Sequence, residues 1–445
     1  MINIIIPNNN VKERIYIIDI FFNSFLKLDY KLKISETLAD IELIYKSKKI
    51  LIKDYFFSNY PKELSYLDKI SIPSEIKKTI RSKFVKSDDL PIIYGEDFIE
   101  EINDKITCNI DIFASSFFML TRWEEYVLRE NKDKFGRFDE NKSLSIRFNF
   151  YKKPIVNEYL NILIEMLTYI GVQVNNEKEY KLKVTHDVDQ IYRYDRFEKY
   201  IKAIGGDLFL RKNPLLIFKT TKDYIKSAIN RKYDPYNTFN YLMEVSERGK
   251  LKSHFYFIPS LKGEEDARYS VMSKQVRSLI LKIKNRGHIV GVHGSWTSFN
   301  NNEIFKKQLS RLKEMSVEEG RQHYLRFENP KTWQIWEDNG LKIDSTLGFY
   351  GRNGFRCGVC YEFPVFNILE RKKLRLIEQP LIFMENSLLS KNYTVEKVLT
   401  ELEELSKQVK KFSGTFVFLW HPNNFNNEWK ELGNYYKSYI KILIK

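Results

Sequence analysis

The chain has 445 residues, and its 73 basic and 58 acidic side chains give a formal net charge of +15. At about 100–200 residues per domain, this length predicts two or three folding units with substantial cores. With 43% apolar residues, 28 Tyr and 32 Phe, the composition excludes disorder over most of the length. Three cysteines are too few for a secreted disulfide framework, and no run approaches the roughly 20 apolar residues that span a bilayer. We therefore expect a cytoplasmic protein.

The first 180 residues carry a net charge of −1 and predict a mixed domain. Short apolar runs separated by polar breaks indicate strands and short helices, and they lie at residues 4–6, 15–22, 41–45 and 50–52. Residues 111–128 (DIFASSFFMLTRWEEYVL) place apolar side chains at helical spacing and predict one buried helix. A polar loop at 132–139 and a second helix at 154–170 follow. The polar stretch at 175–181 predicts a boundary between an α+β domain over 1–178 and a second domain over 179–445.

Beyond this boundary, strands and helices alternate. The predicted strands lie at 180–185, 254–258, 288–292, 323–327, 342–345, 375–378 and 415–419. The predicted helices lie at 239–248, 271–284, 304–314, 330–339 and 395–412. This alternation predicts a mostly parallel sheet covered on both faces, either open or closed into a barrel. In such folds the chemistry gathers at the carboxyl ends of the strands.

Acidic and imidazole side chains occur where these strands end or begin. The first strand runs into Asp187 and Asp189, another runs into His293, His323 begins a strand, and the last strand runs into His421. A catalytic zinc site takes nitrogen and oxygen ligands and leaves one position open to water, so Asp189, His293 and His323 are candidate ligands. Asp187 then remains as general base and His421 as general acid. The alternative is that the two aspartates cap a loop and the histidines are ordinary hydrogen-bonding groups.

The carboxy-terminal part carries the whole positive excess, +16 over residues 181–445. The densest basic stretch, residues 191–232, interleaves lysines and arginines with apolar residues such as Leu215 and Phe218. One interpretation is contact with an anionic surface, either lipid headgroups or an acidic glycan. The other is a solvated helix face in a lysine-rich chain, which we favour at this stage. No nucleic-acid-binding module accompanies the charge, so no nucleic-acid partner is expected.

Several motifs together resemble the polysaccharide deacetylase (NodB-homology) superfamily. They are THDVD, KLKSHFYFIP, GHIVGVHGSW, the segment beginning RQHYLRFENP, and FVFLWHP, and they occur in the order of that family between residues 181 and 421. The resemblance implies a distorted (β/α) barrel fold. It also implies an enzyme that removes acetyl groups from glycans. The closest branch is associated with bacterial surface polysaccharides. In that branch IFASSFFMLTRWEEY and GRFDENKS would belong to a smaller amino-terminal α+β accessory domain.

The resemblance also implies roles for individual residues. Asp187 would be the catalytic base, Asp189 and His293 metal ligands, and His421 the acid. Arg321, or as a second choice Arg326, would hold the base in place. The family has a second histidine four positions after the first, where this chain has Thr297. We infer that His323 replaces it, and the expected cofactor is a divalent metal, with zinc as the first choice.

The resemblance also implies an acetylated oligo- or polysaccharide as substrate, and of its N- and O-acetyl groups we expect the N-acetyl group to be the one removed. Trp296 and Trp420 are neighbours of site residues and are candidates for stacking on a sugar ring, although core packing is the commoner role of Trp. Phe355 and Arg356 lie in a glycine-rich segment that is either a substrate loop or a solvent loop. The alternative to a hydrolase is a catalytically inactive glycan-binding or scaffold protein that uses the basic half, and Thr297 motivates it.

Overall fold

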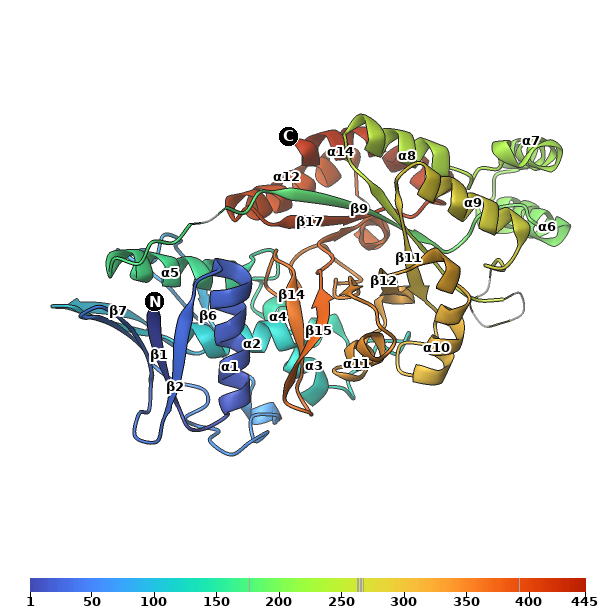
Figure 1. Ribbon diagram of the computed structural model, residues 1–445. Helices are drawn as coiled ribbons and strands as arrows, with labels where there is room; N and C mark the ends of the chain where they lie inside the picture. The colour runs from blue at the N-terminus through green and yellow to red at the C-terminus, as the bar shows by residue number, and fades with distance from the viewer. Residues whose placement is uncertain (176, 262–263, 265, 267, 392) are drawn as a thin grey trace.

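A six-stranded mixed sheet forms the amino-terminal end of the molecule (Figure 1). The computed structural model describes residues 1–445 except 176, 262–263, 265, 267 and 392, so one position of the predicted boundary lies outside the described residues. The strand order is β2-β1-β3-β4-β8-β7. The strands are β1 (Ile2–Pro7), β2 (Tyr30–Ser35), β3 (Ile41–Tyr45), β4 (Lys48–Ile52), β7 (Gly95–Ile102) and β8 (Lys105–Ile110). A short pair, β5 (Lys77–Lys78) and β6 (Pro91–Ile92), lies beside it.

Helices connect this sheet to the rest of the chain. They are α1 (Val11–Asp19), α2 (Ile112–Thr121), α3 (Trp123–Val127), α4 (Leu144–Arg147) and α5 (Ile155–Tyr169). The prediction of one helix over 111–128 is wrong, because Arg122 adopts a left-handed conformation (φ 50°) that separates α2 from α3. The buried Arg122 guanidinium binds Glu124 and Glu125 on the first turn of α3, which stabilises this break.

The second sheet has nine strands in the order β14-β15-β13-β12-β11-β10-β9-β17-β16. All neighbours are parallel except the antiparallel pair β14–β15. The strands are β9 (Lys181–Val188), β10 (Ser253–Phe257), β11 (Ile289–Gly294), β12 (Glu319–Gln322), β13 (Ile343–Asp344), β14 (Phe363–Asn367), β15 (Lys372–Glu378), β16 (Phe383–Met384) and β17 (Thr415–Leu419). Within the described residues, the edge strands β14 and β16 do not pair, so the sheet is curled and open. The expected α/β alternation is confirmed, whereas barrel closure is not seen.

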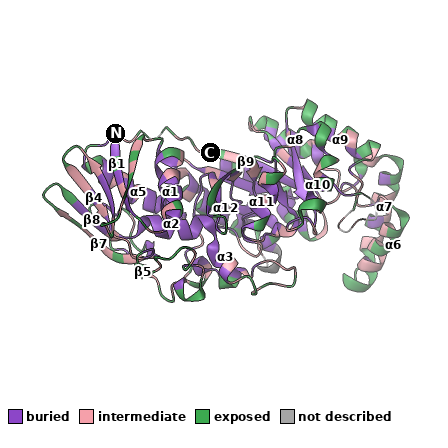
Figure 2. Ribbon diagram, turned by 60° about the horizontal axis from the view of Figure 1, so that its bottom comes forward, coloured by how far each residue is buried: buried purple, intermediate pink, exposed green. Residues whose placement is uncertain are grey.

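Helices cover the parallel strands, and the main apolar core continues into the amino-terminal part. They are α8 (Phe239–Arg248), α9 (Lys274–Asn285), α10 (Asn302–Ser310), α11 (Lys331–Asp338), α12 (Val395–Lys411), α13 (Lys430–Asn434) and α14 (Tyr436–Ile444). Helices α1 and α2 pack against β15 and β14, and buried residues of both sheets belong to one hydrophobic cluster (Figure 2). None of the helices in the described residues is both long and apolar enough to cross a membrane.

One strand that positions the site differs from its prediction. The expected strand at 323–327 is instead β12, which ends at Gln322, and His323 follows it in a tight turn. Tyr324 and Leu325 have left-handed backbones, with φ of 60° and 54°, which extended strands do not allow. His323 therefore lies at the carboxyl end of its strand.

Candidate metal centre

The carboxyl ends of four parallel strands bring the predicted acidic and imidazole side chains to one pocket. Asp187 is in β9 and Asp189 directly follows it, His293 is in β11, His323 follows β12, and His421 follows β17. All five line a pocket of about 320 Å³. The structure thus brings together side chains that the strand-end rule had selected.

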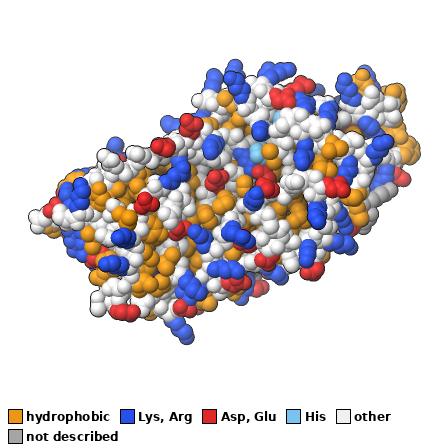
Figure 3. Space-filling model, in the orientation of Figure 1, with side chains coloured by type: hydrophobic (Ala, Val, Ile, Leu, Met, Phe, Trp, Pro, Cys, Tyr) orange, Lys and Arg blue, Asp and Glu red, His pale blue; other side chains and the backbone are white. Residues whose placement is uncertain are grey.

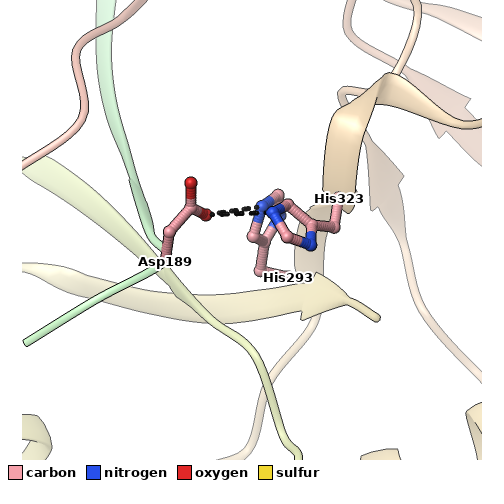
Figure 4. Close-up of side chains that lie close together, drawn as sticks. All are labelled: Asp189, His293 and His323. Carbon is pink, nitrogen blue, oxygen red and sulfur yellow. Dashed lines mark ion pairs between the residues drawn. The ribbon is translucent and has the colours of Figure 1, made fainter. Parts of the chain in front are cut away.

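Three of these side chains have the geometry of a metal-binding group. Asp189 Oδ1 lies 3.4 Å from His293 Nε2 and 3.5 Å from His323 Nε2 (Figure 4). One candidate ligand atom from each residue lies within 4.8 Å of the other two. His293 and His323 are buried, and Asp189 is partly buried. This mixed set of nitrogen and oxygen donors is one that zinc accepts.

The outer contacts of both imidazoles orient their free nitrogens toward this point. His293 Nδ1 lies 2.9 Å from the carbonyl oxygen of Arg321, so Nδ1 carries the proton and donates it. His323 Nδ1 lies 2.6 Å from Asp266 Oδ2, which likewise accepts from it. In metal-binding histidines, a hydrogen bond to the ring nitrogen that does not bind the metal fixes the tautomer. Within the described part of the chain, neither His293 Nε2 nor Asp189 Oδ1 has a hydrogen-bond partner, although both are buried. A cation at this point would satisfy both atoms.

The charges in the pocket are strongly coupled. Burial alone would raise the pKa of Asp189, but the charge of His323 and contacts from both imidazoles hold it well below its ordinary value. Burial would lower the pKa of His323, yet Asp189 and Asp266 raise it to about 9. Metal ligands must be deprotonated, so a cation bound here would compete with the His323 proton.

A second carboxylate, Asp187, is held by a buried arginine. Arg321 Nη1 donates to Asp187 Oδ1 at 2.8 Å, and its Nε donates to the carbonyl of Ser345 at 2.8 Å. The other oxygen, Asp187 Oδ2, lies 3.8 Å from His293 Nε2. Arg321, rather than Arg326, therefore contacts the expected base, because the Arg326 guanidinium lies over the ring of Trp296.

His421 faces the same point from the end of β17, the strand that pairs with β9. Its Nε2 lies 3.8 Å from Asp189 Oδ2, and its Nδ1 lies 2.7 Å from Glu385 Oε1. Burial would lower the pKa of His421, but the carboxylate of Glu385 and the charges of Asp189 and Asp187 raise it to about 10. His421 is therefore poised to hold a proton at neutral pH. Sequence reasoning missed Glu385, as it missed Asp266, because no local motif marks either residue.

The amino-terminal part supplies one wall of the pocket. Phe135 and Arg137 come from the polar loop predicted at 132–139. The Phe135 ring stacks on Tyr324 with centroids 5.4 Å apart, and the Arg137 guanidinium lies 3.6 Å above the centre of the Tyr350 ring. The segment GRFDENKS, noted in the sequence for its family resemblance, contains Arg137. Nothing in the sequence indicated that the loop reaches the site.

The candidate substrate residues lie elsewhere or at the margin. Trp420 is fully buried, packs against Trp429 and Tyr436, and donates from its indole N–H to the carbonyl of Asn424. The structure therefore does not bring Trp420 to the pocket, because aromatic packing in the core surrounds it. Trp296 is partly buried and contacts Tyr324, a pocket residue, edge to face.

The two candidates of the glycine-rich segment also lie away from the pocket. Phe355 is fully buried in the core, and the buried Arg356 donates to both carboxylate oxygens of Glu125, at 2.9 Å and 2.6 Å. Both side chains thus make internal contacts in place of the expected contact with substrate. Thr297 is partly buried, and His323 is the third member of the group of candidate ligands.

Comparison with known proteins gives limited matches. The model of a family of unknown function, DUF7033, matches residues 2–172. No curated protein matches the chain. Among solved structures, the chain is similar to a "putative polysaccharide deacetylase" from Mycobacterium smegmatis, with 14% identity and a TM-score of 0.37 over 61% of this chain and 86% of that one. Fold and site together define an α/β protein with a candidate His₂Asp metal centre at the strand ends.

Proposed function

We propose that this protein is a metal-dependent hydrolase that removes an acetyl group, carried on nitrogen, from a sugar of a bacterial surface polysaccharide or its precursor. One observation carries the proposal. Two buried atoms that have no hydrogen-bond partner among the described residues and could bind a cation, His293 Nε2 and Asp189 Oδ1, face each other beside an arginine-bound carboxylate and a cationic histidine. This combination is the one expected for hydrolysis of an acyl bond.

The chain would hold the cation through Asp189 Oδ1, His293 Nε2 and His323 Nε2, with zinc as the best match to these donors. When bound, such a cation supplies Lewis-acid polarisation of an acyl carbonyl and makes a water molecule more acidic. Asp266 and the Arg321 carbonyl keep the two imidazoles oriented before the cation arrives. This preorganisation favours binding of a cation at the three candidate ligand atoms.

Asp187 and His421 would carry the two proton transfers. Arg321 occupies Asp187 Oδ1, so Oδ2 remains to accept the proton of the attacking water. His421, held protonated by Glu385, donates a proton to the amine that leaves. A base and an acid that flank one point complete a hydrolytic cycle without covalent catalysis.

The walls of the pocket support a sugar as substrate. Aromatic rings of Phe135, Tyr324 and Tyr350 and the amides of Asn386 and Asn423 surround the charged floor. Aromatic faces pack against the apolar faces of sugar rings, while amides bind hydroxyl groups. The family resemblance of the motifs between residues 181 and 421 favours the same substrate class.

Acetate release tests the proposal directly. Full-length protein loaded with zinc is incubated with N-acetylhexosamine oligomers, and Asp187→Asn and His421→Asn are compared with the exposed control Asp104→Asn. We expect each pocket variant to lower kcat/KM by about 10²–10⁴-fold while the control stays at the wild-type value. Equal release by wild type and Asp187→Asn would eliminate the assigned base.

Metal analysis separates the hydrolase from an inactive binding protein. We expect close to one equivalent of zinc in the wild type and a substoichiometric amount in His323→Ala, since this change removes one of three ligands. Less than about 0.1 equivalent in the wild type, together with no acetate release, would favour the glycan-binding or scaffold alternative.

A further inference from the structure

The connection between β9 and α8 contains a helical hairpin that projects from the body of the molecule (Figure 1). It consists of α6 (Phe197–Gly205), the π-helical turn η4 (Gly206–Leu210) and α7 (Leu215–Ile229). We call residues 197–229 the helical hairpin. Because it follows the carboxyl end of β9, it emerges on the same edge of the sheet as the candidate metal centre.

The two arms of the helical hairpin are fastened to each other. The Tyr200 and Tyr224 rings stack with centroids 4.2 Å apart, and the Tyr200 hydroxyl lies 3.0 Å from Thr221 Oγ1. Near the turn, Thr220 donates to the buried carboxylate of Asp207 at 2.6 Å. These contacts make the helical hairpin an ordered element.

Its exposure pattern is the reverse of that of an ordinary surface helix. No residue of α6 is buried, and the buried residues of α7 are the polar Thr220 and Ser227. Large apolar side chains are exposed instead, with 84% for Leu210, 75% for Phe218 and 80% for Ile229 (Figure 2). Large apolar side chains are normally buried when a protein folds. A contiguous group of them that stays exposed therefore indicates a binding surface.

Basic residues accompany the apolar ones. Between positions 197 and 232 the chain has nine lysines and arginines and three acidic residues. On α7, Phe218, Ile225 and Ile229 share one helix face at i, i+7 and i+11, while Lys222 and Lys226 lie at its border. Apolar and basic side chains also alternate over this part of the surface (Figure 3). An apolar face bordered by lysines is the pattern of helices that lie in a membrane interface.

We propose that the helical hairpin docks the protein on the surface of an anionic lipid bilayer. Its apolar face enters the boundary between headgroups and acyl chains, and its lysines contact the lipid phosphates. An acidic glycan would engage the lysines but leave the apolar face in water. A second copy of this chain would bring two basic faces together. The docking goes beyond the proposed hydrolase, because it involves none of the pocket residues.

Vesicle co-sedimentation of the full-length protein tests the docking. Vesicles of phosphatidylcholine with about one-third phosphatidylglycerol are compared with phosphatidylcholine alone, at salt of about 0.05 M and 0.5 M. We expect binding to the anionic vesicles at low salt and much weaker binding in the other conditions. Replacing Lys219, Lys222 and Lys226 by Gln is expected to weaken binding about fivefold per charge.

A second experiment tests how much the apolar side chains contribute to vesicle binding. It compares substitutions of apolar side chains that are equally exposed inside and outside the helical hairpin. We expect Phe218→Ser with Ile229→Ser to weaken vesicle binding at least tenfold, about what loss of interfacial burial of two large side chains implies. The matched control is Ile80→Ser with Ile70→Ser, whose side chains are 75% and 80% exposed outside the helical hairpin and should leave binding unchanged. Zinc content should stay at the wild-type value in every variant, which keeps this test independent of the proposed hydrolase.

Three results would overturn the docking. The first is no wild-type binding to anionic vesicles at low salt. The second is that the Phe218 and Ile229 double variant binds the vesicles as strongly as the wild type, which would show that charge alone holds the protein on the vesicle. The third is a dimer in sedimentation velocity that this double variant abolishes, without vesicle binding, which would assign the apolar face to a second copy.

Discussion

The carboxylate of Asp266 offers the sharpest test of the metal centre, because it does not belong to the three candidate ligands. Its Oδ2 accepts hydrogen bonds from His323 Nδ1 and from the backbone N–H of Trp296, both at 2.6 Å. Burial would raise the pKa of Asp266, but the hydrogen bond and charge of His323 lower it, so the carboxylate stays ionised. Substituting Asp266→Asn keeps the shape and removes the charge that orients and polarises His323.

The expected loss of zinc affinity follows from the role of Asp266 as the hydrogen-bond partner of a candidate metal-binding histidine. Removing such a partner lowers metal affinity by about 10–100-fold, which corresponds to about 1.4–2.8 kcal/mol. Asp266→Asn should lie near the lower end, because its amide oxygen still accepts from Nδ1. Asp266→Ala should lie near the upper end, because His323 Nδ1 then has no acceptor there.

Competition between the metal-free protein and a chromogenic chelator for zinc measures these affinities. The matched control is Glu264→Gln, a carboxylate of the same loop that accepts from both terminal nitrogens of Arg311, at 2.6 Å and 2.7 Å. The control should bind zinc as the wild type does. Wild-type affinity in Asp266→Asn would refute the reasoning, and so would equal losses in Asp266→Asn and Glu264→Gln, since the cause would then be a disturbed loop.

Three further changes have defined outcomes. Glu385→Gln removes the anion that raises the pKa of His421, so the alkaline limb of the kcat/KM profile should move to lower pH by about one to three units, and an unmoved limb would contradict the pairing. His186 is buried, and burial lowers its pKa to about 3, so it stays neutral in the folded protein while the unfolded chain takes up a proton below about pH 6.5. Folding stability is therefore lost as the pH falls, by about 2 kcal/mol between pH 7 and pH 5 for this group, and denaturant unfolding at both pH values should show a smaller loss for His186→Asn. Arg356→Met leaves the buried Glu125 with Arg122 as its remaining cation and should destabilise the fold by about 3 kcal/mol, whereas an unchanged unfolding midpoint would show that the pair contributes nothing.

Much of the carboxy-terminal architecture follows from the sequence. Buried parallel strands are continuous apolar runs, so β17 has its predicted bounds, and α8 has them as well because its apolar residues repeat at helical spacing. The strand predicted at residue 323 is wrong because a short run of bulky residues such as HYLRF does not reveal the left-handed backbones of Tyr324 and Leu325. Tertiary contacts, and not local pattern, determine that turn.

The floor of the site could be predicted, but its walls and supports could not. Asp187, Asp189, His293 and His421 lie in the last residues of strands or just after them, and parallel strands bring their ends to one edge. Asp266 and Glu385 lie in connections where no periodicity exists, and each meets its histidine only after the chain has folded. Phe135 and Arg137 lie more than a hundred residues before Tyr324 and Tyr350, so only the packing of the amino-terminal part brings them together.

The segment that leads from the helical hairpin to α8 is hydrogen-bonded to the segment that follows His421. Thr238 Oγ1 donates to the carbonyl of Pro422 at 2.6 Å, and Asn426 donates to the carbonyl of Pro235 at 2.8 Å. With the helical hairpin resting on a bilayer, this short rigid link would set both the height and the tilt of the pocket above the lipid. Polymers tethered to the same leaflet would then be processed at one fixed distance from their anchor.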